Sequence, residues 1–296
     1  MTLTTEPTTL DELRGRAWNI RRRIVDVCAN PQGGHLGGSL SLVEVLTALY
    51  FDVMRVDPAL PDDPDRDIFL LSKGHAAIGL YCTLAERGYF DVDELTRYAE
   101  TGSRLMGHPT RDVPGVEMPT GSLGHGPALA LGFALAAKLS GSPQKTYVAL
   151  GDGETQEGSV WEAAMGAAGL RLDNLVAVVD RNGLQLTGDT EEICPLEPVA
   201  DRWRSFGWAV REVPGQDMAA VREALASAPW EPGRPSVLVA RTTKGAGVPF
   251  VAGKPKSHYV AFGERQHARA LSALRRAAEQ GGAPQRPNAG GGGADD

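Results

Sequence analysis

The segment GDGETQEGSVWEAAMGAAGLRLDNLVAVVDRNG, residues 151–183, decides the fold of this chain. It follows the apolar run TYVAL, which is typical of a strand buried on both faces of a sheet. After the turn at residues 151–153, the pattern predicts a helix over residues 155–171 and a second buried strand over residues 174–183. This succession predicts an α/β fold, in which a parallel sheet carries helices on both faces.

The rest of the chain continues the alternation of strands and helices. Thr9 and Glu12 have the spacing of a capping box at the start of a helix over residues 11–30. We expect further strands at residues 67–75, 208–215 and 235–245, and further helices at residues 42–54, 76–90, 91–100 (capped by Asp91), 127–141, 217–228 and 264–280. The helix over residues 127–141 is nearly all apolar, which predicts burial on most of its sides.

Two glycine-rich stretches, residues 31–41 and 101–126, are predicted as loops. A long loop inside a compact domain is more often functional than idle. We expect one domain over residues 9–280, between a frayed start at residues 1–8 and a low-complexity, disordered tail at residues 281–296.

The composition excludes several classes of function. The chain has 296 residues and a net charge of −7, which argues against a nucleic-acid binder because such proteins carry a basic face. Its three cysteines form no C-x-x-C pair, which favours buried thiols in a reducing compartment. With neither a signal-peptide pattern nor an apolar run of membrane-spanning length, we expect a cytoplasmic protein without membrane contact.

Asp152 lies between two glycines in a turn that resembles a phosphate-binding loop. A phosphate would repel its carboxylate, so the aspartate must serve another purpose. Asp152 and Asn182 each follow a predicted strand, so a parallel sheet brings both to the edge where ligands bind. Their oxygens suit a hard divalent cation such as Mg²⁺ or Ca²⁺, and a diphosphate could supply further ligands. Gly151 and Gly153 would let the backbone approach that diphosphate, beside the N-terminus of the following helix.

Competing motifs fit this turn less well. A P-loop requires a lysine after its last glycine, whereas Ser159 follows Gly158. A dinucleotide fingerprint requires its third glycine two positions earlier than Gly158. Asp152 could also be a plain helix cap in a tight turn, although a strand that ends in Asn182-Gly183 makes the whole pattern more specific.

Five of the six histidines lie in glycine-rich or loop-like stretches, where chemistry is often located. They are His35, His75, His108, His125 and His258. Scattered histidines are usually structural or exposed, and we interpret His267, in a polar helix, as a surface residue. Histidines at a sugar site would bind hydroxyl groups and move the proton that C–C bond cleavage requires.

These motifs together resemble those of the thiamine diphosphate enzymes and, more closely, of transketolases that are split into two subunits. GGHLGGSLS, LSKGHAAIGLY, MGHP, TGSLGHG, GDGETQEG, VVDRNG and TTKGAGV occur in the family's order between about Asp11 and His258. The resemblance implies the thiamine-diphosphate-binding fold, here its diphosphate-binding domain. It also implies the cofactors thiamine diphosphate and Mg²⁺ (or Ca²⁺).

The resemblance also implies roles for individual residues. It implies metal ligation by Asp152, Asn182 and the carbonyl of Leu184. It implies cofactor contacts from His75, Gly121, Ser122, Leu123, Gly153, Asn182, Lys244 and His258. It implies catalytic roles for His35, His108 and His258 at the substrate, and for Glu157 at a subunit interface. Glu157 could instead be an ordinary first-turn glutamate, which the helix dipole favours.

Three residues depart from the family pattern. Leu36 replaces the usual proline after the first histidine, His125 replaces a glutamine, and Tyr259 replaces the glycine after the last histidine. Two of these changes adjoin presumed substrate histidines, so they put the usual donor or acceptor in doubt.

The resemblance further implies a division of labour with another subunit. In the family, the glutamate that activates the cofactor's aminopyrimidine ring comes from the next domain, which this chain lacks. We therefore expect a C-terminal partner subunit, an α2β2 assembly, and transfer of a two-carbon ketol unit from a ketose phosphate to an aldose acceptor. Two alternatives remain open: a related enzyme that acts on a 2-oxo acid or other non-sugar substrate, and a non-catalytic cofactor-binding or regulatory subunit.

Overall fold

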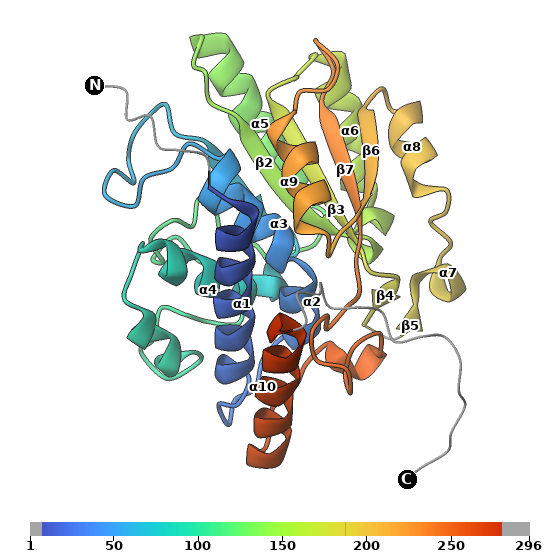
Figure 1. Ribbon diagram of the computed structural model, residues 1–296. Helices are drawn as coiled ribbons and strands as arrows, with labels where there is room; N and C mark the ends of the chain where they lie inside the picture. Colours follow the sequence, from blue (N-terminus) through green and yellow to red (C-terminus); the bar gives the residue numbers. More distant parts are fainter. Residues whose placement is uncertain (1–7, 187, 280–296) are drawn as a thin grey trace.

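A five-stranded parallel sheet forms the centre of the computed structural model, which describes residues 8–186 and 188–279 (Figure 1). The strand order is β1-β2-β3-β7-β6 and all neighbours are parallel, as the sequence predicts. The strands are β1 Ile68–Leu71, β2 Thr146–Gly151, β3 Leu175–Arg181, β6 Ala209–Pro214 and β7 Ser236–Arg241. A separate antiparallel pair consists of β4 Leu184–Gln185 and β5 Gly188–Asp189.

Helices surround this sheet and connect its strands. The α-helices are α1 Leu10–Val27, α2 Leu36–Ser41, α3 Val43–Ala48, α4 Ala77–Arg87, α5 Gly126–Ser140, α6 Gly158–Gly169, α7 Thr190–Ile193, α8 Val199–Ser205, α9 Met218–Ala226 and α10 Glu264–Glu279. Short 3-10 turns cover Gly74–Ala76, Val92–Arg97, Gly153–Gln156 and Pro255–Ser257, and a π-helical turn covers Leu49–Val53.

The two faces of the sheet face two separate cores, because side chains alternate along each strand. Tyr147 and Val178 represent one face, which packs in a cluster with buried residues of α1, α3, α4 and α9. Val148 and Val179 represent the other face, which packs with α5, α6 and α8. The prediction of helices on both faces is therefore confirmed.

Several local predictions are confirmed and others are wrong. Thr9 and Glu12 form the expected capping box at the start of α1. The glycine-rich stretch around His35 contains the buried helix α2 instead of a continuous loop. Burial explains this difference, since Gly37 and Gly38 lie where a Cβ would meet Ser257, Lys244 and His75.

Further corrections concern two predicted helices and the burial of the cysteines. Residues 91–100 contain a 3-10 turn capped by Asp91, not an α-helix. The helix α6 begins at Gly158 rather than at residue 155, because a 3-10 turn capped by Asp152 precedes it. Cys194 is exposed, whereas Cys28 and Cys82 are buried, and all three thiols are free.

The apolar helix α5 is buried along one face only, which contradicts the predicted burial on most sides. Its buried residues are Gly126, Pro127, Ala130, Ala134 and Ala137. Leu139 is 79% exposed, and on the neighbouring helix α6 Met165 is 61% exposed. The sequence pattern was misleading because an apolar residue can face a surface that this chain alone does not cover.

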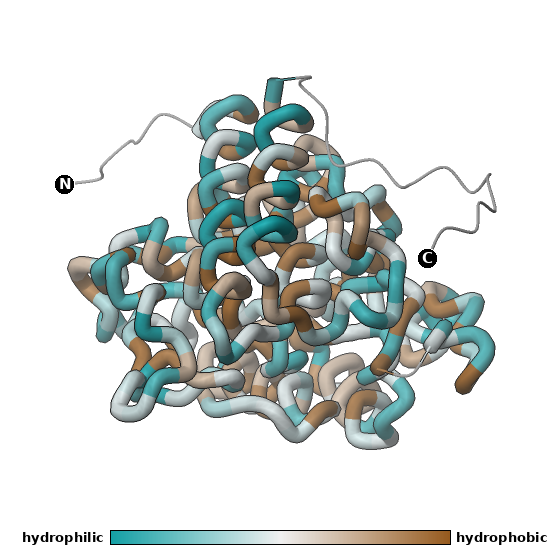
Figure 2. The backbone as a smooth tube through the Cα atoms, turned by 90° about the horizontal axis from the view of Figure 1, so that it is seen from below, coloured by the Kyte–Doolittle hydropathy of each residue, from teal (hydrophilic) through white to brown (hydrophobic). Residues whose placement is uncertain are grey.

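The described residues leave the predicted ends of the domain largely untested. Thr8 donates a hydrogen bond to the carbonyl of Phe51, at 2.9 Å. Residues 1–7 and 280–296, which hold most of the predicted frayed start and the predicted tail, lie outside the described residues. Within the described residues, no helix is long and apolar enough to cross a membrane, and hydrophilic segments interrupt the hydrophobic ones along the coloured tube of Figure 2.

Candidate active site

The carboxyl ends of β1, β2, β3 and β7 meet along one edge of the sheet, and the segments that follow them carry most of the predicted site residues. Asp152 comes directly after β2, and Asn182 directly after β3. The backbone N–H of Gly183 donates to Asp152 Oδ2 at 2.6 Å, which joins the two turns. Asp152 and Asn182 therefore lie together at this edge, as predicted.

The carboxylate of Asp152 is buried but retains an acceptor position. Its Oδ2 accepts from Gly183 N and from Arg181 Nη1, the latter at 3.0 Å, while Oδ1 accepts from Gly153 N at 2.8 Å. A carboxylate offers about four lone-pair sites. Within the described residues, Oδ1 thus keeps one of its lone pairs for a ligand. Burial and the negative charge of Asp180 raise the pKa of Asp152, and its three donors oppose this shift.

The amide of Asn182 is held in one orientation. Its Nδ2 donates to Asp180 Oδ2 at 3.0 Å, and its Oδ1 accepts from Leu184 N at 3.1 Å. The carbonyl of Leu184 accepts from Lys244 Nζ at 3.1 Å, so a cationic group already binds the oxygen that the family resemblance implies as a metal ligand. A carboxylate, an amide and a carbonyl are the oxygen donors that Mg²⁺ and Ca²⁺ prefer, so these residues fit such an ion.

This donor set contains a single carboxylate. In the described part of the chain, no group of three or more His, Cys, Asp or Glu residues could hold a metal by itself. A divalent ion at Asp152 would therefore need further oxygens from its ligand, which agrees with a cation that binds together with a diphosphate.

Lys244 connects the cation donors to the histidines. Its Nζ lies 3.2 Å from His258 Nδ1. Burial and the ammonium of Lys73 lower the pKa of Lys244 to about 8, against the opposing charges of Asp180 and Asp152. An anion placed beside Lys244 would relieve this repulsion, so the site favours a negatively charged ligand.

Four of the predicted histidines form one cluster. The ring centroid of His35 lies 5.5 Å from that of His75, 5.9 Å from that of His108 and 5.2 Å from that of His258. His75 and His258 are stacked, with centroids 5.3 Å apart. Tyr259, one of the departures from the family pattern, packs edge-on against His35 at 4.9 Å.

The environment lowers the pKa values of three of the clustered imidazoles, those of His35, His75 and His258, which favours their neutral form. Burial, with the electrostatic influence of His108 and Lys244, lowers the pKa of His35 to about 4. Burial and Lys244 likewise lower the pKa of His258 to about 4. Burial and Lys73 lower the pKa of His75 well below its ordinary value. Neutral imidazoles can both donate and accept hydrogen bonds, which suits a ligand with many hydroxyl groups.

The loop that contains Gly121, Ser122 and Leu123 lies beside the same edge. Thr120 Oγ1 donates to the carbonyl of Leu71 at the end of β1, at 2.7 Å. Gly121 has φ +153, and a Cβ there would lie 3.0 Å from the ring of His108. A Cβ on Gly74 would meet Thr120 and the nitrogen of Gly121, so the loop packs directly on the turn that carries His75.

Three residues named in the sequence analysis lie away from these contacts. Glu157 is exposed at the N-cap of α6, and its side chain makes no capping hydrogen bond. His125 is exposed at the N-cap of α5, where its Nδ1 lies 3.1 Å from the carbonyl of Leu123. His267, which we expected on the surface, is partly buried because its Nε2 pairs with Asp26 at 2.8 Å.

The sequence reasoning missed three charged residues of the site. Lys73 and Asp180 form a buried ion pair beneath Asn182, and Arg181 binds Asp152. Each lies close in sequence to a predicted site residue, since Lys73 is in the SKGH turn, and Asp180 and Arg181 precede Asn182. Charged residues at the ends of buried strands were the signal that could have identified them.

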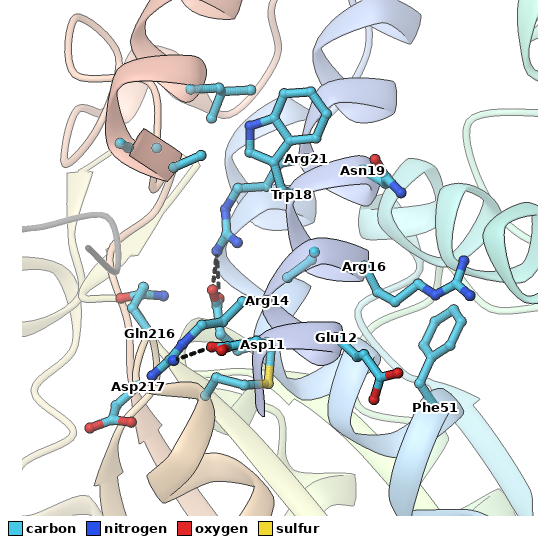
Figure 3. A pocket seen from close by; sticks show the side chains of 18 of the residues that line it. Asp11, Glu12, Arg14, Arg16, Trp18, Asn19, Arg21, Phe51, Gln216 and Asp217 are labelled. Atoms are coloured by element: carbon cyan, nitrogen blue, oxygen red, sulfur yellow. Dashed lines mark hydrogen bonds and ion pairs between the residues drawn. The ribbon is translucent and has the colours of Figure 1, made fainter. Parts of the chain in front are cut away.

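A separate pocket lies between α1, α9 and α10, and none of the predicted site residues line it (Figure 3). Arg21 and Glu44 form an ion pair in it, with both carboxylate oxygens 2.5 Å from Arg21 Nη2. Two lining atoms, Trp18 Nε1 and Arg21 Nε, have no hydrogen-bond partner among the described residues, but both are buried away from solvent. We therefore assign no chemistry to this pocket.

Comparison with known proteins agrees with this geometry. Residues 15–278 match the family described as transketolase, thiamine diphosphate binding domain. The chain is 50% identical over 251 residues to a protein of Actinobacillus succinogenes that is named as one subunit of apulose-4-phosphate transketolase, covering 84% of this chain and 91% of that protein. It is 42% identical over 264 residues to a protein of Clostridium sp. named 6-deoxy-6-sulfo-D-fructose transketolase subunit SqwG, covering 89% of this chain and 96% of that protein.

Solved structures give the same result. A mutant transketolase from Pichia stipitis superimposes with a TM-score of 0.83 at 32% identity, covering 96% of this chain and 43% of that one. The transketolase from Leishmania mexicana has a TM-score of 0.82 at 32% identity, covering 95% of this chain and 42% of that one. This chain therefore spans less than half the length of these solved transketolases.

Proposed function

The chain belongs to the transketolase family, as its thiamine diphosphate binding domain, and we propose that it is the N-terminal subunit of a two-component transketolase. It would transfer a two-carbon ketol unit from a ketose phosphate to an aldose acceptor, together with a C-terminal subunit. The observation that carries this proposal is the meeting of Asp152, Asn182, Leu184 and Lys244 at the carboxyl edge of the sheet.

Asp152 Oδ1, Asn182 Oδ1 and the Leu184 carbonyl would hold Mg²⁺ or Ca²⁺, with the remaining ligands supplied by the cofactor's diphosphate. Lys244, His75 and Gly153 would bind the diphosphate itself. Support for Gly153 comes from its position, since its N–H donates to Asp152 Oδ1 at 2.8 Å and it thus lies beside the proposed cation ligand. Gly121, Ser122 and Leu123 would contact the aminopyrimidine ring. When bound, the cofactor supplies the carbon nucleophile and the electron sink for ketol transfer.

His35, His108 and His258 would bind the hydroxyl groups of the sugar and move protons on its oxygens. The contact between Lys244 Nζ and His258 Nδ1 supports a particular tautomer. A protonated lysine can only donate, so Nδ1 accepts and the hydrogen of the neutral ring lies on Nε2. His258 Nε2–H would therefore donate to a substrate oxygen.

The names of the relatives support a sugar substrate and an enzyme that consists of two kinds of subunit. One is named for apulose-4-phosphate and another for 6-deoxy-6-sulfo-D-fructose, and both names describe a single subunit of a transketolase. These names favour a sugar with an anionic end group over a 2-oxo acid or another non-sugar substrate. The intact set of cation and diphosphate residues disfavours a non-catalytic regulatory subunit.

An α2β2 assembly would explain the exposed apolar face of α5 and α6. Leu139 and Met165 are both largely exposed there. In a closed two-fold assembly the same patch of two copies can pack together, so we propose that a second copy of this chain covers it. Glu157, exposed at the start of α6, would then lie near a subunit interface and connect two active sites.

Calorimetric titration of thiamine diphosphate with Mg²⁺ tests the proposal, with the full chain alone and with a candidate C-terminal subunit. We expect cofactor binding that strengthens with the partner and weakens at least about 100-fold in Asp152→Asn, because the donor set loses its carboxylate charge. Asp201→Asn, an exposed carboxylate in a surface ion pair, is the matched control and should bind normally. Failure of the folded wild-type chain to bind under either condition would overturn the proposal.

A further inference from the structure

Arg181 is a buried arginine that contacts the proposed metal ligand on one side and a neighbouring segment on the other. Its side chain is 7% exposed and pairs with Asp152, Glu191 and Glu197. We propose, on the basis of the function above, that Arg181 is a positioning residue for the cation site. It holds Asp152 so that one oxygen faces the cation, and it makes this geometry depend on residues 188–197.

The first step follows from the lone pairs of Asp152. Arg181 Nη1 and Gly183 N, at 3.0 and 2.6 Å, occupy Oδ2, whereas Oδ1 accepts from Gly153 N alone among the described residues. Both lone pairs of Oδ2 are thus used, and a cation meets Oδ1. Without Arg181, Oδ2 would also become available, and the carboxylate could rotate or bind the ion through both oxygens.

The second step follows from the shape of the guanidinium group. Arg181 Nη2 donates to Glu191 Oε1 at 2.7 Å, and Arg181 Nε donates to Glu197 Oε1 at 3.1 Å. Arg181 Nη1 also donates to Thr190 Oγ1 at 2.5 Å. Because the guanidinium is planar and rigid, these partners fix the direction in which Nη1 meets Asp152. A lysine is a single point charge and cannot satisfy these partners at once.

The third step concerns how the segment itself is held. Glu191 accepts from the backbone N–H of Leu196 at 3.1 Å, and Glu197 accepts from that of Val199 at 3.0 Å. The two carboxylates are therefore fixed to the backbone that follows β5. A shift of this segment would move Arg181 and, through it, Asp152, so the segment contributes to cation affinity without touching the cation.

Arg181→Lys in the full chain, alone and with a candidate partner subunit, tests this role. We would titrate Mg²⁺ at saturating thiamine diphosphate and measure the half-saturating Mg²⁺ concentration by calorimetry. We expect an increase of about 10–100-fold, the usual effect of removing a residue that orients a metal ligand. The affinity for thiamine diphosphate at saturating Mg²⁺ should change much less. A merely structural role of Arg181 would instead weaken the binding of Mg²⁺ and of the cofactor alike.

Arg222→Lys is the matched control, because Arg222 also makes two hydrogen bonds to one carboxylate, that of Asp52, but contacts neither Asp152 nor residues 188–197. Its Mg²⁺ requirement should stay near that of the wild type. If Arg181→Lys does not fold, Glu191→Gln tests the same link with Arg181 in place, and it should raise the Mg²⁺ requirement in the same direction.

The outcomes separate this proposal from the proposed function. If the wild type binds the cofactor in a Mg²⁺-dependent way and Arg181→Lys requires no more Mg²⁺, the positioning role is wrong and the function stands. An equal effect of Arg181→Lys and Arg222→Lys would also overturn it, because the effect would then be general destabilisation. If the wild type shows no Mg²⁺-dependent binding, the proposed function itself fails.

Discussion

Lys73 and Asp180 form an ion pair in the interior, where their side chains are 1% and 0% exposed. Ser41 Oγ donates to the same carboxylate at 2.7 Å, and Thr242 Oγ1 donates to its other oxygen. Burial acts to raise the pKa of Asp180, but Lys73 and these hydroxyl groups outweigh it, so the pKa is lowered. The charged pair lies directly beneath Asn182, whose Nδ2 binds Asp180, and thus forms the base of the cation site.

Removal of one member of this pair should destabilise the fold strongly. In Lys73→Met, Asp180 would remain as a buried carboxylate without its cation, so we expect a loss of about 3–5 kcal/mol in the free energy of unfolding. Urea denaturation measures it. The double variant Lys73→Met with Asp180→Asn should recover part of the loss, and a single-variant loss below about 1 kcal/mol would contradict the assigned role.

Two glycines should respond in opposite ways to alanine. A Cβ on Gly74 would lie 2.7 Å from the carbonyl carbon of Thr120, so Gly74→Ala should cost about 1–3 kcal/mol and weaken cofactor binding through the adjacent loop. A Cβ on Gly15, inside α1, would meet nothing within 4 Å, so Gly15→Ala should stabilise the chain by about 0.5–1 kcal/mol. Thermal unfolding of both variants checks the pair, and equal shifts would contradict the crowding at Gly74.

The ring of Tyr259, which packs against His35, should affect the pKa of that histidine. Burial is the largest cause of the low pKa of His35, and the Tyr259 ring contributes to that burial at a centroid distance of 4.9 Å. Tyr259→Gly should therefore raise the pKa of His35 from about 4 towards its ordinary value of 6.5. NMR titration of the imidazole signals measures this shift. A pKa that stays near 4 would mean that the other histidines and Lys244 dominate.

The histidine cluster should make stability depend on pH in a defined window. His35 and His258 have folded-state pKa values of about 4, below their unfolded values near 6.5. Between pH 6.5 and 4 the unfolded chain binds protons that the folded chain does not, so the free energy of unfolding should fall as the pH is lowered. Urea titrations at several pH values should show a smaller fall in His35→Asn, and an unchanged slope would contradict the low pKa.

The exposed face of α5 and α6 gives a prediction about assembly. Leu139→Glu with Met165→Glu should change the stability of the single chain little, since both side chains are largely exposed. The double variant should nevertheless have a lower oligomeric mass by light scattering, because it places negative charges in the proposed interface. Leu60→Glu, at a position that is 58% exposed, is the control and should leave the mass unchanged. An unchanged mass in the double variant would remove this face from the assembly.

Much of the sheet could be predicted because its strands carry their own signal. The runs around Val148 and Val178 are apolar, short and bounded by polar turns, which specifies buried parallel strands. The positions of Asp152 and Asn182 followed from topology alone, since parallel strands end on one edge. That both Lys244 and His258 contact the cofactor was implied only by the family resemblance, because nothing in the spacing of these residues brings them together.

The sequence was less informative where tertiary contacts decide local structure. The helix α2 contains Gly37 and Gly38, which disfavour an isolated helix, but burial against Lys244 and His75 overrides that preference. For α5 the sequence predicted more burial than the structure shows. An apolar pattern does not reveal whether the helix is covered by this chain or by another one. Arg181 was missed because its four partners lie in segments that only the fold brings together.

The candidate site draws on turns from nearly the whole length of the chain, from His35 near the start to His258 near the end. Contacts between such distant segments form late in folding, because the chain must first close long loops. During synthesis on the ribosome, the cofactor would therefore find no complete binding surface until almost all of the chain has emerged. A fragment that ends before His258 would lack one of the residues proposed to bind the cofactor, so the site would be completed only near the end of synthesis.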